Sequence, residues 1–552
     1  MNDQMNKSGL SGRALPIFLM LLMAPVASLF SQIPDVEVEI INPLKVTLPF
    51  AERNFDKVPV NPPAPVYPPL EYQYKAISFT APPFAAAVKP LKLKTPEQEV
   101  PTRGYVTLGY GNYGSPFADV FFPVSKLSNA KSAAGIRAFH HSFFKGPVEG
   151  KASASGNTSL TADFKRTGDV VSTEGLISFR NQYTGYYGYP EGTPIKRDTI
   201  AQAWNTLSAA LLFANTRKSD YNFQFRTGLS HLWNKYAAAE TEINLDFQSM
   251  LSLSEKTGLN LNAGYVLLSR EDSKVDPKPR HLFRGTLSYV FNPRKDLKFE
   301  AGARFAYEND TLVKNSFHLY PVFNTTWVLR PRVTFTASVA GDIEKVSLQS
   351  LSSQNPWLAD NVSLSHTNNL LSVDAALRAA ATAGLSLFAG LRYGGYADLY
   401  FFSNVAARTS RFEMVYDDAR LTGLYAGFSL QKGKATLNLR GDYLGWSASG
   451  LAAPFHRPKY KAELDGAFTI AERLLVRPYA IVLGGIQAPG AAPGTAVTLP
   501  AATDIGVRTD FNFSERGAVM VRVTNLLSTN YALFQHYPVR GIQAMAGLTW
   551  KF

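Results

Sequence analysis

The last twelve residues of the chain, Gly541–Phe552, alternate between apolar and mostly polar side chains. Counted in twos from the C-terminus, one face of this segment carries Phe552, Trp550, Leu548, Ala546, Ala544 and Ile542. A period of two predicts a β-strand with one apolar face. A strand of about ten residues with this pattern fits the wall of a transmembrane β-barrel. The last strand of a soluble sandwich is the alternative.

The rest of the chain favours the barrel, because alternating segments follow one another from about residue 102 onward. The clearest examples are Asp220–Asn234, Glu242–Gln248, Asp296–Glu308 and Asp504–Phe513. Short polar turns are expected near 126–131, 166–170, 214–219, 254–257, 292–296, 329–332, 381–384, 431–434, 470–473 and 514–517. Longer connections are expected at 182–197, 270–280, 346–365, 398–411, 486–501 and 528–540.

Ten short turns join ten pairs of strands, and one further strand stands at each end of the array. The sequence therefore predicts an all-β fold, a large antiparallel transmembrane barrel of about 22 strands, within a range of about 20 to 24. An even number of strands lets the two ends meet and close the barrel. Short periplasmic turns and longer extracellular loops are typical of such barrels.

The composition agrees with a membrane barrel and excludes several classes of chemistry. Aromatic residues make up 12% of the 552 residues and charged residues only 18%. The chain has no cysteine, which excludes disulfides, thiolate catalysis and iron–sulfur sites. The net charge of +13 would suit nucleic-acid binding, but the basic residues are spread through the strands and we expect no nucleic-acid partner.

The first hundred residues differ from the rest of the chain. Residues 1–31 combine basic residues, an apolar run and small residues, a pattern that predicts a secretory signal peptide. Residues 32–101 contain 14 prolines, which disfavour helix and central strand. We expect an extended periplasmic or lumenal segment there, followed by the barrel at 102–552. A disordered periplasmic tail is the alternative.

The end of the barrel sequence carries a recognisable motif. Asn525-Leu-Leu-Ser-Thr-Asn-Tyr531, followed by Pro538-Val-Arg540-Gly541, resembles the penultimate strand and last-strand approach of TonB-dependent receptors. The resemblance covers roughly 366–552. It implies an outer-membrane location, solute uptake and energisation by TonB. A stretch near the predicted mature N-terminus resembles a TonB box and comprises Asp35, Val36, Glu37, Val38, Glu39 and Ile40.

The chain departs from that family before the barrel, because residues 32–101 are too few and too rich in proline for the family's globular plug. Three functional hypotheses follow. The first is a receptor-like uptake protein, the second a plugless diffusion porin, and the third a structural subunit of an outer-membrane complex. The expected partners are outer-membrane lipid and TonB or another envelope protein bound through 32–101. The barrel-assembly machinery is a further expected partner, through the C-terminal strand with Trp550 and Phe552.

Enzymatic motifs are weak or missing. Gly109-Tyr-Gly-Asn-Tyr-Gly114 matches a dinucleotide fingerprint, but Ser115-Pro116 and another strand follow it, so it predicts a tight hairpin turn. His140 and His141 are adjacent and point to opposite faces of a strand. No H-E-x-x-H, G-x-S-x-G or P-loop pattern occurs. We therefore expect no enzyme activity, no cofactor and no metal.

Charged residues on the polar faces of the strands are predicted to face the lumen. They are Arg226, Glu242, Asp246, Lys298, Glu300, Arg304, Arg440, Asp442, Arg508, Asp510 and Arg522. One interpretation is a salt-bridge lattice that holds the shape of the lumen. The other is a pore lining, or a docking surface for residues 32–101, since charged rings tune selectivity when they line a pore.

Overall fold

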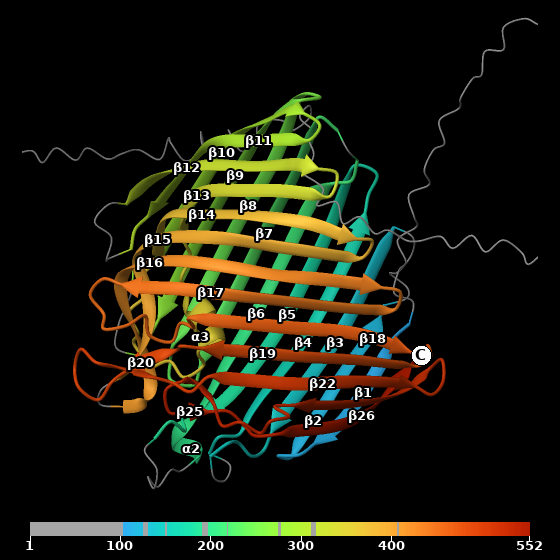
Figure 1. Cartoon of the computed structure of the whole chain (residues 1–552). Helices are drawn as coiled ribbons and strands as arrows, with labels where there is room; N and C mark the ends of the chain where they lie inside the picture. Colours follow the sequence, from blue (N-terminus) through green and yellow to red (C-terminus); the bar gives the residue numbers. More distant parts are fainter. Residues whose placement is uncertain are drawn as a thin grey trace, which may run out of the picture. The chain divides into compact units, whose positions relative to one another are not determined.

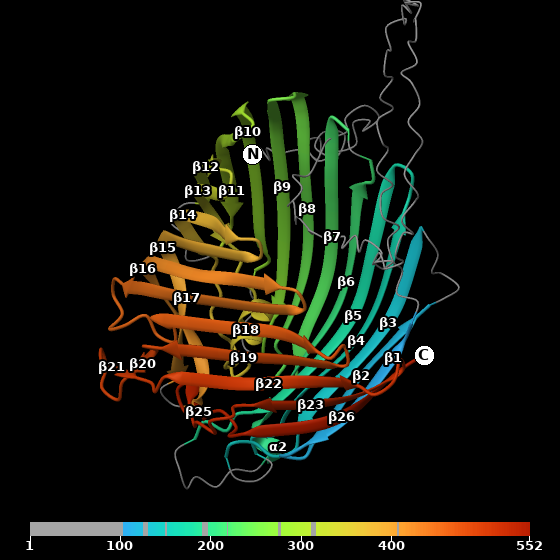
Figure 2. The ribbon, with the colours of Figure 1, turned by 45° about the vertical axis from the view of Figure 1, so that its right-hand side comes forward.

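The computed structural model describes residues 103–124, 131–148, 152–189, 197–217, 219–273, 278–310, 316–405 and 408–552. The predicted signal peptide, the proline-rich segment and the TonB-box-like stretch lie outside the described residues. Twenty-two strands of the described chain form a single sheet, drawn in Figures 1 and 2.

The first eleven wall strands are β1 (Tyr105–Gly111), β2 (Ser115–Pro123), β3 (Ser132–Phe143), β4 (Ser155–Thr167), β5 (Val171–Gly185), β6 (Ala201–Asn215), β7 (Tyr221–Asn234), β8 (Ala239–Ser254), β9 (Thr257–Glu271), β10 (Arg280–Arg294) and β11 (Leu297–Glu308). The other eleven are β12 (Phe317–Arg330), β13 (Val333–Glu344), β14 (Thr367–Thr382), β15 (Leu385–Val405), β16 (Arg408–Lys432), β17 (Ala435–Ala448), β18 (Tyr460–Ile470), β19 (Leu474–Gly484), β22 (Ala502–Asn512), β23 (Gly517–Thr524) and β26 (Gln543–Lys551). The connections carry α2 (Arg197–Ile200), α3 (Leu348–Gln354), β20 (Gln487–Pro489), β21 (Ala496–Thr498), β24 (Ala532–Phe534) and β25 (Tyr537–Pro538).

Each wall strand pairs antiparallel with its neighbours in the chain, and the first strand closes on the last. β1 pairs with β26 from Tyr105 opposite Lys551 to Gly111 opposite Met545. Closure satisfies the backbone donors and acceptors that an open edge would expose to lipid, at several kcal/mol each. The predicted closed antiparallel barrel and its strand number are confirmed.

The outer face of the barrel is apolar. Large exposed side chains on it include Leu108, Leu160, Leu229, Leu287, Leu319, Leu391, Leu424 and Leu548, which are 50–70% exposed. The same alternation turns the polar residues of each strand toward the lumen. A closed barrel with this surface spans a membrane by its strands and belongs to the class found in bacterial outer membranes. Among the described residues, no helix is long and apolar enough to cross a membrane.

The predicted turns agree with the structure, whereas one predicted loop does not. The predicted short turns fall at the same end of the wall, between consecutive strands, apart from residues 126–130 and 218, which lie outside the described residues. The sequence 109–114 forms the predicted hairpin turn between β1 and β2, with Tyr113 and Gly114 at positive φ. The predicted loop at 398–411 is wrong, because β15 and β16 continue as a paired hairpin to Asn404 opposite Phe412. Other loops cover both faces of this extension, so its apolar residues do not alternate as they do in the wall.

The largest buried apolar cluster lies at the long-loop end, the end that faces outward in outer-membrane barrels. Leu348, Leu351 and Leu358 from the connection between β13 and β14 are almost fully buried there, together with Phe412 and Tyr537. The fold thus places its core where loops enter the barrel mouth.

Candidate functional site

The connection between β13 and β14 folds into the barrel rather than outward. We call residues 345–366 the inner loop. Its helix α3 begins at an N-cap, Ser347, whose hydroxyl accepts from the Ser350 amide at 3.1 Å, while the Ser350 hydroxyl accepts from the Ser347 amide at 2.9 Å. This reciprocal cap satisfies amides that a short helix leaves unpaired. Figure 1 shows α3 near the ends of the strands that carry the long loops.

One side of the inner loop binds the inner face of β5–β8. The Trp204 indole N–H donates to the Pro356 carbonyl at 2.9 Å. Ser230 bonds to the Gln349 side chain at 2.9 Å, and Lys345 forms an ion pair with Glu242. The carboxylate of Glu240, which is 2% exposed, accepts the backbone N–H of Gln349 at 3.1 Å. These contacts fix α3 against the wall below it.

The other side of the inner loop binds β16, which stands ten strands from β6 in the ring of 22. Leu358 pairs with Phe412 in a parallel β-bridge. The backbone amide of Ala359 donates to the Phe412 carbonyl at 2.8 Å, and that of Phe412 donates to the Trp357 carbonyl at 2.9 Å. The inner loop therefore bridges nearly opposite walls and crosses the lumen.

A second loop, residues 525–542, meets the inner loop through aromatic side chains. Trp357 packs against Tyr537 and Phe534, and Tyr537 also packs against Tyr187. The Tyr537 hydroxyl donates to the Ser410 carbonyl. Burial raises the pKa of both Tyr187 and Tyr537 above the ordinary range, so both phenols stay neutral. The two loops thus form one apolar closure across the mouth.

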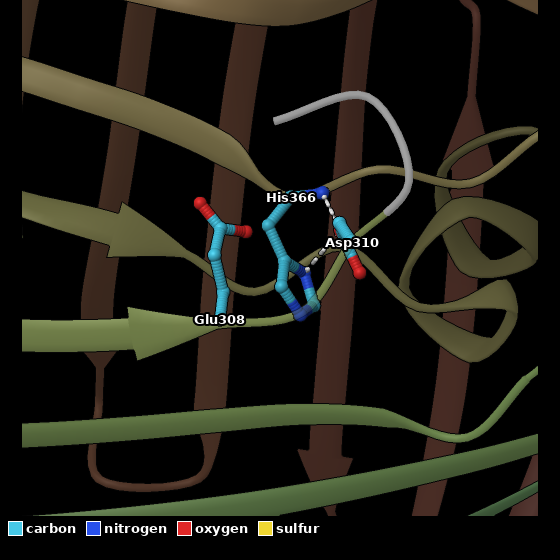
Figure 3. Close-up of side chains that lie close together, drawn as sticks. All are labelled: Glu308, Asp310 and His366. Carbon is cyan, nitrogen blue, oxygen red and sulfur yellow. Dashed lines mark hydrogen bonds and ion pairs between the residues drawn. The ribbon is translucent and has the colours of Figure 1, made fainter. Parts of the chain in front are cut away.

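A buried polar cluster anchors the ends of the inner loop, and Figure 3 shows three of its side chains. The Arg280 guanidinium binds both oxygens of Asp310, at 2.6 and 2.9 Å, and donates to the Val346 carbonyl at 2.9 Å. Asp310 also accepts the backbone N–H of His366 at 2.6 Å. Burial alone would raise the pKa of Asp310, but the bonds and charge of Arg280, with the His366 amide, hold it below its ordinary value.

The imidazole of His366 is neutral in this cluster. Its Nδ1 accepts from the Val346 amide at 3.0 Å and from Arg280 at 2.9 Å, which leaves the ring proton on Nε2. Burial, with the nearby charge of Arg280, lowers the pKa of His366 to about 3. Val346 and His366 lie at the two ends of the inner loop, so one cluster holds both ends.

The same cluster contains the one group of potential metal ligands among the described residues. Ligand atoms of Glu308, Asp310 and His366 lie within 4.8 Å of one another, and all three residues are buried. Asp310, however, is already bound by Arg280, whose positive charge opposes a cation. Glu308 faces His318 at 3.4 Å. We therefore interpret the cluster as a structural ion-pair network.

The predicted lumen charges form several pairs across and along neighbouring strands. Arg440 binds Asp442 at 2.8 Å and Arg508 binds Asp510 at 2.9 Å. Glu242 pairs with Lys345 of the inner loop. Arg304 binds Asp342 at 3.0 Å, a partner that the sequence did not suggest. These pairs are what a salt-bridge lattice requires.

The other predicted lumen residues have polar or aromatic neighbours, or no side-chain partner within the described chain. Glu300 accepts from Asn260 at 2.8 Å and Asn324 at 3.1 Å. Arg522 lies over the ring of Phe117. Within the described chain, the side chains of Arg226, Asp246 and Lys298 make no hydrogen bond or ion pair, although Arg226 and Asp246 stand opposite each other in register. At the end of the chain, Trp550 and Phe552 are 53% and 49% exposed, and Phe552 packs against Phe122.

The sequence predicted a loop at 346–365 but not its inward course. One signal was present, since Leu348, Leu351, Leu358, Val362 and Leu364 are an unusual apolar content for an exposed loop. Those side chains are buried in the structure. An apolar loop at a barrel mouth needs a surface to cover it, and here the lumen supplies that surface.

Comparison with known proteins identifies the fold. No protein-family model and no curated protein matches the sequence. Among solved structures, the ferric-catecholate import receptor Fiu from E. coli K12 matches with a TM-score of 0.62 at 9% identity over 82% of each chain. The siderophore receptor PirA from Acinetobacter baumannii matches with 0.61 at 11% identity, over 82% of this chain and 80% of that one. The FrpB iron transporter from Neisseria meningitidis matches with 0.62 at 12% identity, over 82% and 81%.

The barrel has the fold of TonB-dependent receptors. The resemblance at Asn525–Tyr531 is therefore confirmed at the level of fold. Asn525 is a turn residue at positive φ, and its side-chain amide donates to the Arg540 carbonyl at 2.8 Å and to the Thr529 carbonyl at 3.0 Å. The motif thus joins the end of β23 to the approach of the last strand. The three neighbours are named as receptors or transporters, not as enzymes.

Proposed function

We propose that this protein is a receptor-like transporter of the outer membrane that passes a solute through its lumen, with the inner loop as the gate. The supporting observation is the position of residues 345–366, which bridge β5–β8 and β16 across the lumen. A segment held at both ends and packed on both walls closes the path as long as those contacts persist. Displacing it opens the path without disturbing the closed sheet.

Residues 32–101 belong to the same proposal as a periplasmic or lumenal segment. Its acidic stretch Asp35–Ile40 would be the contact with TonB, and the lumen-facing charges would be the surface on which the segment docks. Deleting 35–40 is then expected to abolish energised uptake while leaving the barrel folded. Unchanged uptake after this deletion would remove TonB from the mechanism.

A reversible cross-link tests the gate, because the chain has no cysteine of its own. Ser230→Cys and Gln349→Cys are joined by a short bis-methanethiosulfonate reagent, because the Gln349 side chain whose end meets Ser230 at 2.9 Å is longer than a cysteine; a reductant removes the link. Thr107→Cys with Thr549→Cys is the matched control, because those hydroxyls also meet at 2.9 Å but lie on the closing strands β1 and β26. Both pairs are made in the mature protein and in a version lacking residues 32–101.

Ion conductance in a planar bilayer is the measurement. In whichever of the two proteins residues 32–101 do not block the lumen, we expect low conductance while the Ser230–Gln349 pair is linked. Conductance should rise when the link is reduced. The control pair should show no redox dependence. Steady conductance with the gate cross-linked identifies a diffusion porin. No conductance even after replacement of 346–365 by a short linker rejects transport and favours a structural subunit.

A further inference from the structure

A cavity of about 390 Å³ lies beneath α3, between the inner loop and the inner face of β5–β8. Its lining includes Arg180 from β5, Arg226 from β7, and Lys345 and Gln349 from the inner loop. The walls are predominantly strand side chains that point inward, so the cavity opens on the lumen and not on the lipid face. It therefore stands on the path that the proposed gate controls.

The charges in this cavity are unbalanced. Lys345 is neutralised by Glu242, with which it forms an ion pair. The guanidinium groups of Arg180 and Arg226 make no ion pair or hydrogen bond within the described chain, and both side chains are exposed to the lumen. Elsewhere on the inner face, Arg440 and Arg508 each have an aspartate partner. The cavity thus presents two guanidinium groups that lack an ion-pair partner within the described chain, unlike those of Arg440 and Arg508.

Polar side chains near Arg180 could complete an anion site. Those of Gln182, Thr206 and Ser208 line the cavity, and within the residues described they make no side-chain hydrogen bond. Thr206 stands opposite Arg180, Gln182 lies beyond that pair, and Ser208 lies toward Arg226. An amide and two hydroxyls supply neutral donors beside the guanidinium groups. Guanidinium groups bind carboxylate and phosphate in a bidentate manner, with bonds stronger than those between neutral groups. The chemistry of the cavity therefore suits oxygen anions.

The two arginines lie at different heights along the barrel wall, as the strand register shows. Arg180 stands opposite Thr206, and Arg226 stands opposite Leu212, six residues further along β6. At about 3.3 Å per residue this is about 20 Å of strand, which two long side chains span only partly from either end. A ligand that contacts both would need acidic groups well apart. A single small ion would contact one arginine at a time.

We propose that this cavity binds a small acidic solute that carries two or more carboxylate or phosphate groups, held between Arg180 and Arg226. The inference rests on the proposed transport function, since it names the class of solute that enters beneath the gate. Binding is nevertheless measurable without transport, so the two proposals fail separately. If the protein binds acids but never conducts, the binding site stands and the proposed gate is rejected. If it conducts but does not bind acids, the binding site is rejected.

Isothermal titration of the full mature protein in detergent tests the site. The probes are glutarate and propane-1,3-bisphosphonate, whose two acidic groups are separated by a three-carbon chain, acetate with one acidic group, and glycerol as the neutral control. We expect glutarate or the bisphosphonate to bind more tightly than acetate and glycerol, and the tighter of the two identifies a carboxylate or a phosphate-like group as the preferred one. Equal affinity for all four probes overturns the proposal.

Charge-removing variants locate the binding. Arg180→Gln and Arg226→Gln should each weaken binding about tenfold or more, the usual effect of losing a charge-assisted hydrogen bond. Arg378→Gln is the matched control, because Arg378 is an exposed arginine on the inner face of β14, outside the cavity lining. An equal loss in Arg378→Gln would show a diffuse charge effect and refute the site. Arg180→Lys, which keeps the charge, should retain part of the affinity and guards against misfolding as the explanation.

Discussion

Trp357 stacks on Tyr537, with 3.8 Å between the ring centroids and 25° between the ring planes. The Trp357 indole also donates to the Gly185 carbonyl at 3.1 Å. This one side chain therefore connects the inner loop to the loop before β26 and to the end of β5. Aromatic pairs of this kind contribute energy beyond the area they bury.

Trp357→Ala is expected to loosen the inner loop. Loss of the stacking, the burial and the indole bond should cost about 3 kcal/mol, which corresponds to a fall of about 100-fold in hydrogen-exchange protection. Exchange mass spectrometry of residues 345–366 measures this directly. Trp327→Ala is the control, because Trp327 is 40% exposed on β12 and has no contact with the inner loop. Unchanged exchange in Trp357→Ala would show that the stack does not hold the closure.

Asp310→Asn is expected to release the anchored ends of the inner loop. The side chains of Asp310 and Arg280 are only 1% and 11% exposed, and removing one partner of a buried ion pair costs about 3–5 kcal/mol. Urea unfolding monitored with a probe on the inner loop reports the loss. Asp169→Asn breaks an exposed pair with Lys131 and should leave the same transition unchanged. Equal effects of the two variants would contradict the structural role of the buried pair.

Acid is expected to weaken the closure through His366. Burial lowers the pKa of His366 to about 3, whereas an unfolded histidine titrates near about 6.5. Between these values the open loop binds more protons than the closed one, so the stability of the closed loop falls as the pH falls. The loss from about pH 7 to about pH 5 is about 2 kcal/mol. Asp310, whose pKa is also lowered, adds a further loss at lower pH.

Hydrogen exchange of residues 345–366 at the two pH values, corrected for intrinsic rates, measures this dependence. His366→Gln removes the titrating ring, so the exchange of residues 345–366 should depend less on pH. The closed loop of this variant should be less stable than that of the unchanged protein at both pH values. A steep response that persists in His366→Gln would assign the effect to another group.

The wall of this protein is predictable from its sequence, and the reason is physical. Lipid outside and water inside impose strict alternation on every strand, and breakers such as Asn292-Pro-Arg-Lys-Asp296 mark the short turns. The ten turns and the strand number follow from those two signals. No comparable rule governs the loops, because their contacts are made between residues far apart in the sequence.

The parts that the sequence did not reveal all depend on such distant contacts. Arg280, Asp310 and His366 come from three separate segments, and none belongs to a recognisable motif. The continuation of β15 and β16 was read as a loop because both of its faces are covered, which removes the alternation. The lumen-facing charges were predicted from the alternation of side chains along each strand, but alternation does not say which of them lack an ion-pair partner, as Arg226 does in the described chain.

Closure of the barrel is expected to depend on Gly547 in the last strand. Gly547 stands opposite Gly109 where β26 meets β1. A Cβ at Gly547 would lie 2.7 Å from the Leu108 carbonyl oxygen and 3.1 Å from the Gly109 Cα, both backbone atoms that side-chain rotation does not move. Gly547→Ala should therefore strain the closing seam by about 1–3 kcal/mol.

The heat-modifiable gel mobility of the folded barrel measures this effect, since an unclosed sheet migrates as the unfolded chain. Gly441→Ala is the matched control, because Gly441 lies within β17 and a Cβ there would meet nothing within 4 Å. We expect a reduced folded fraction for Gly547→Ala and a normal one for Gly441→Ala. If both variants fold equally well, the seam has room for a methyl group and the close approach of β1 and β26 does not limit closure.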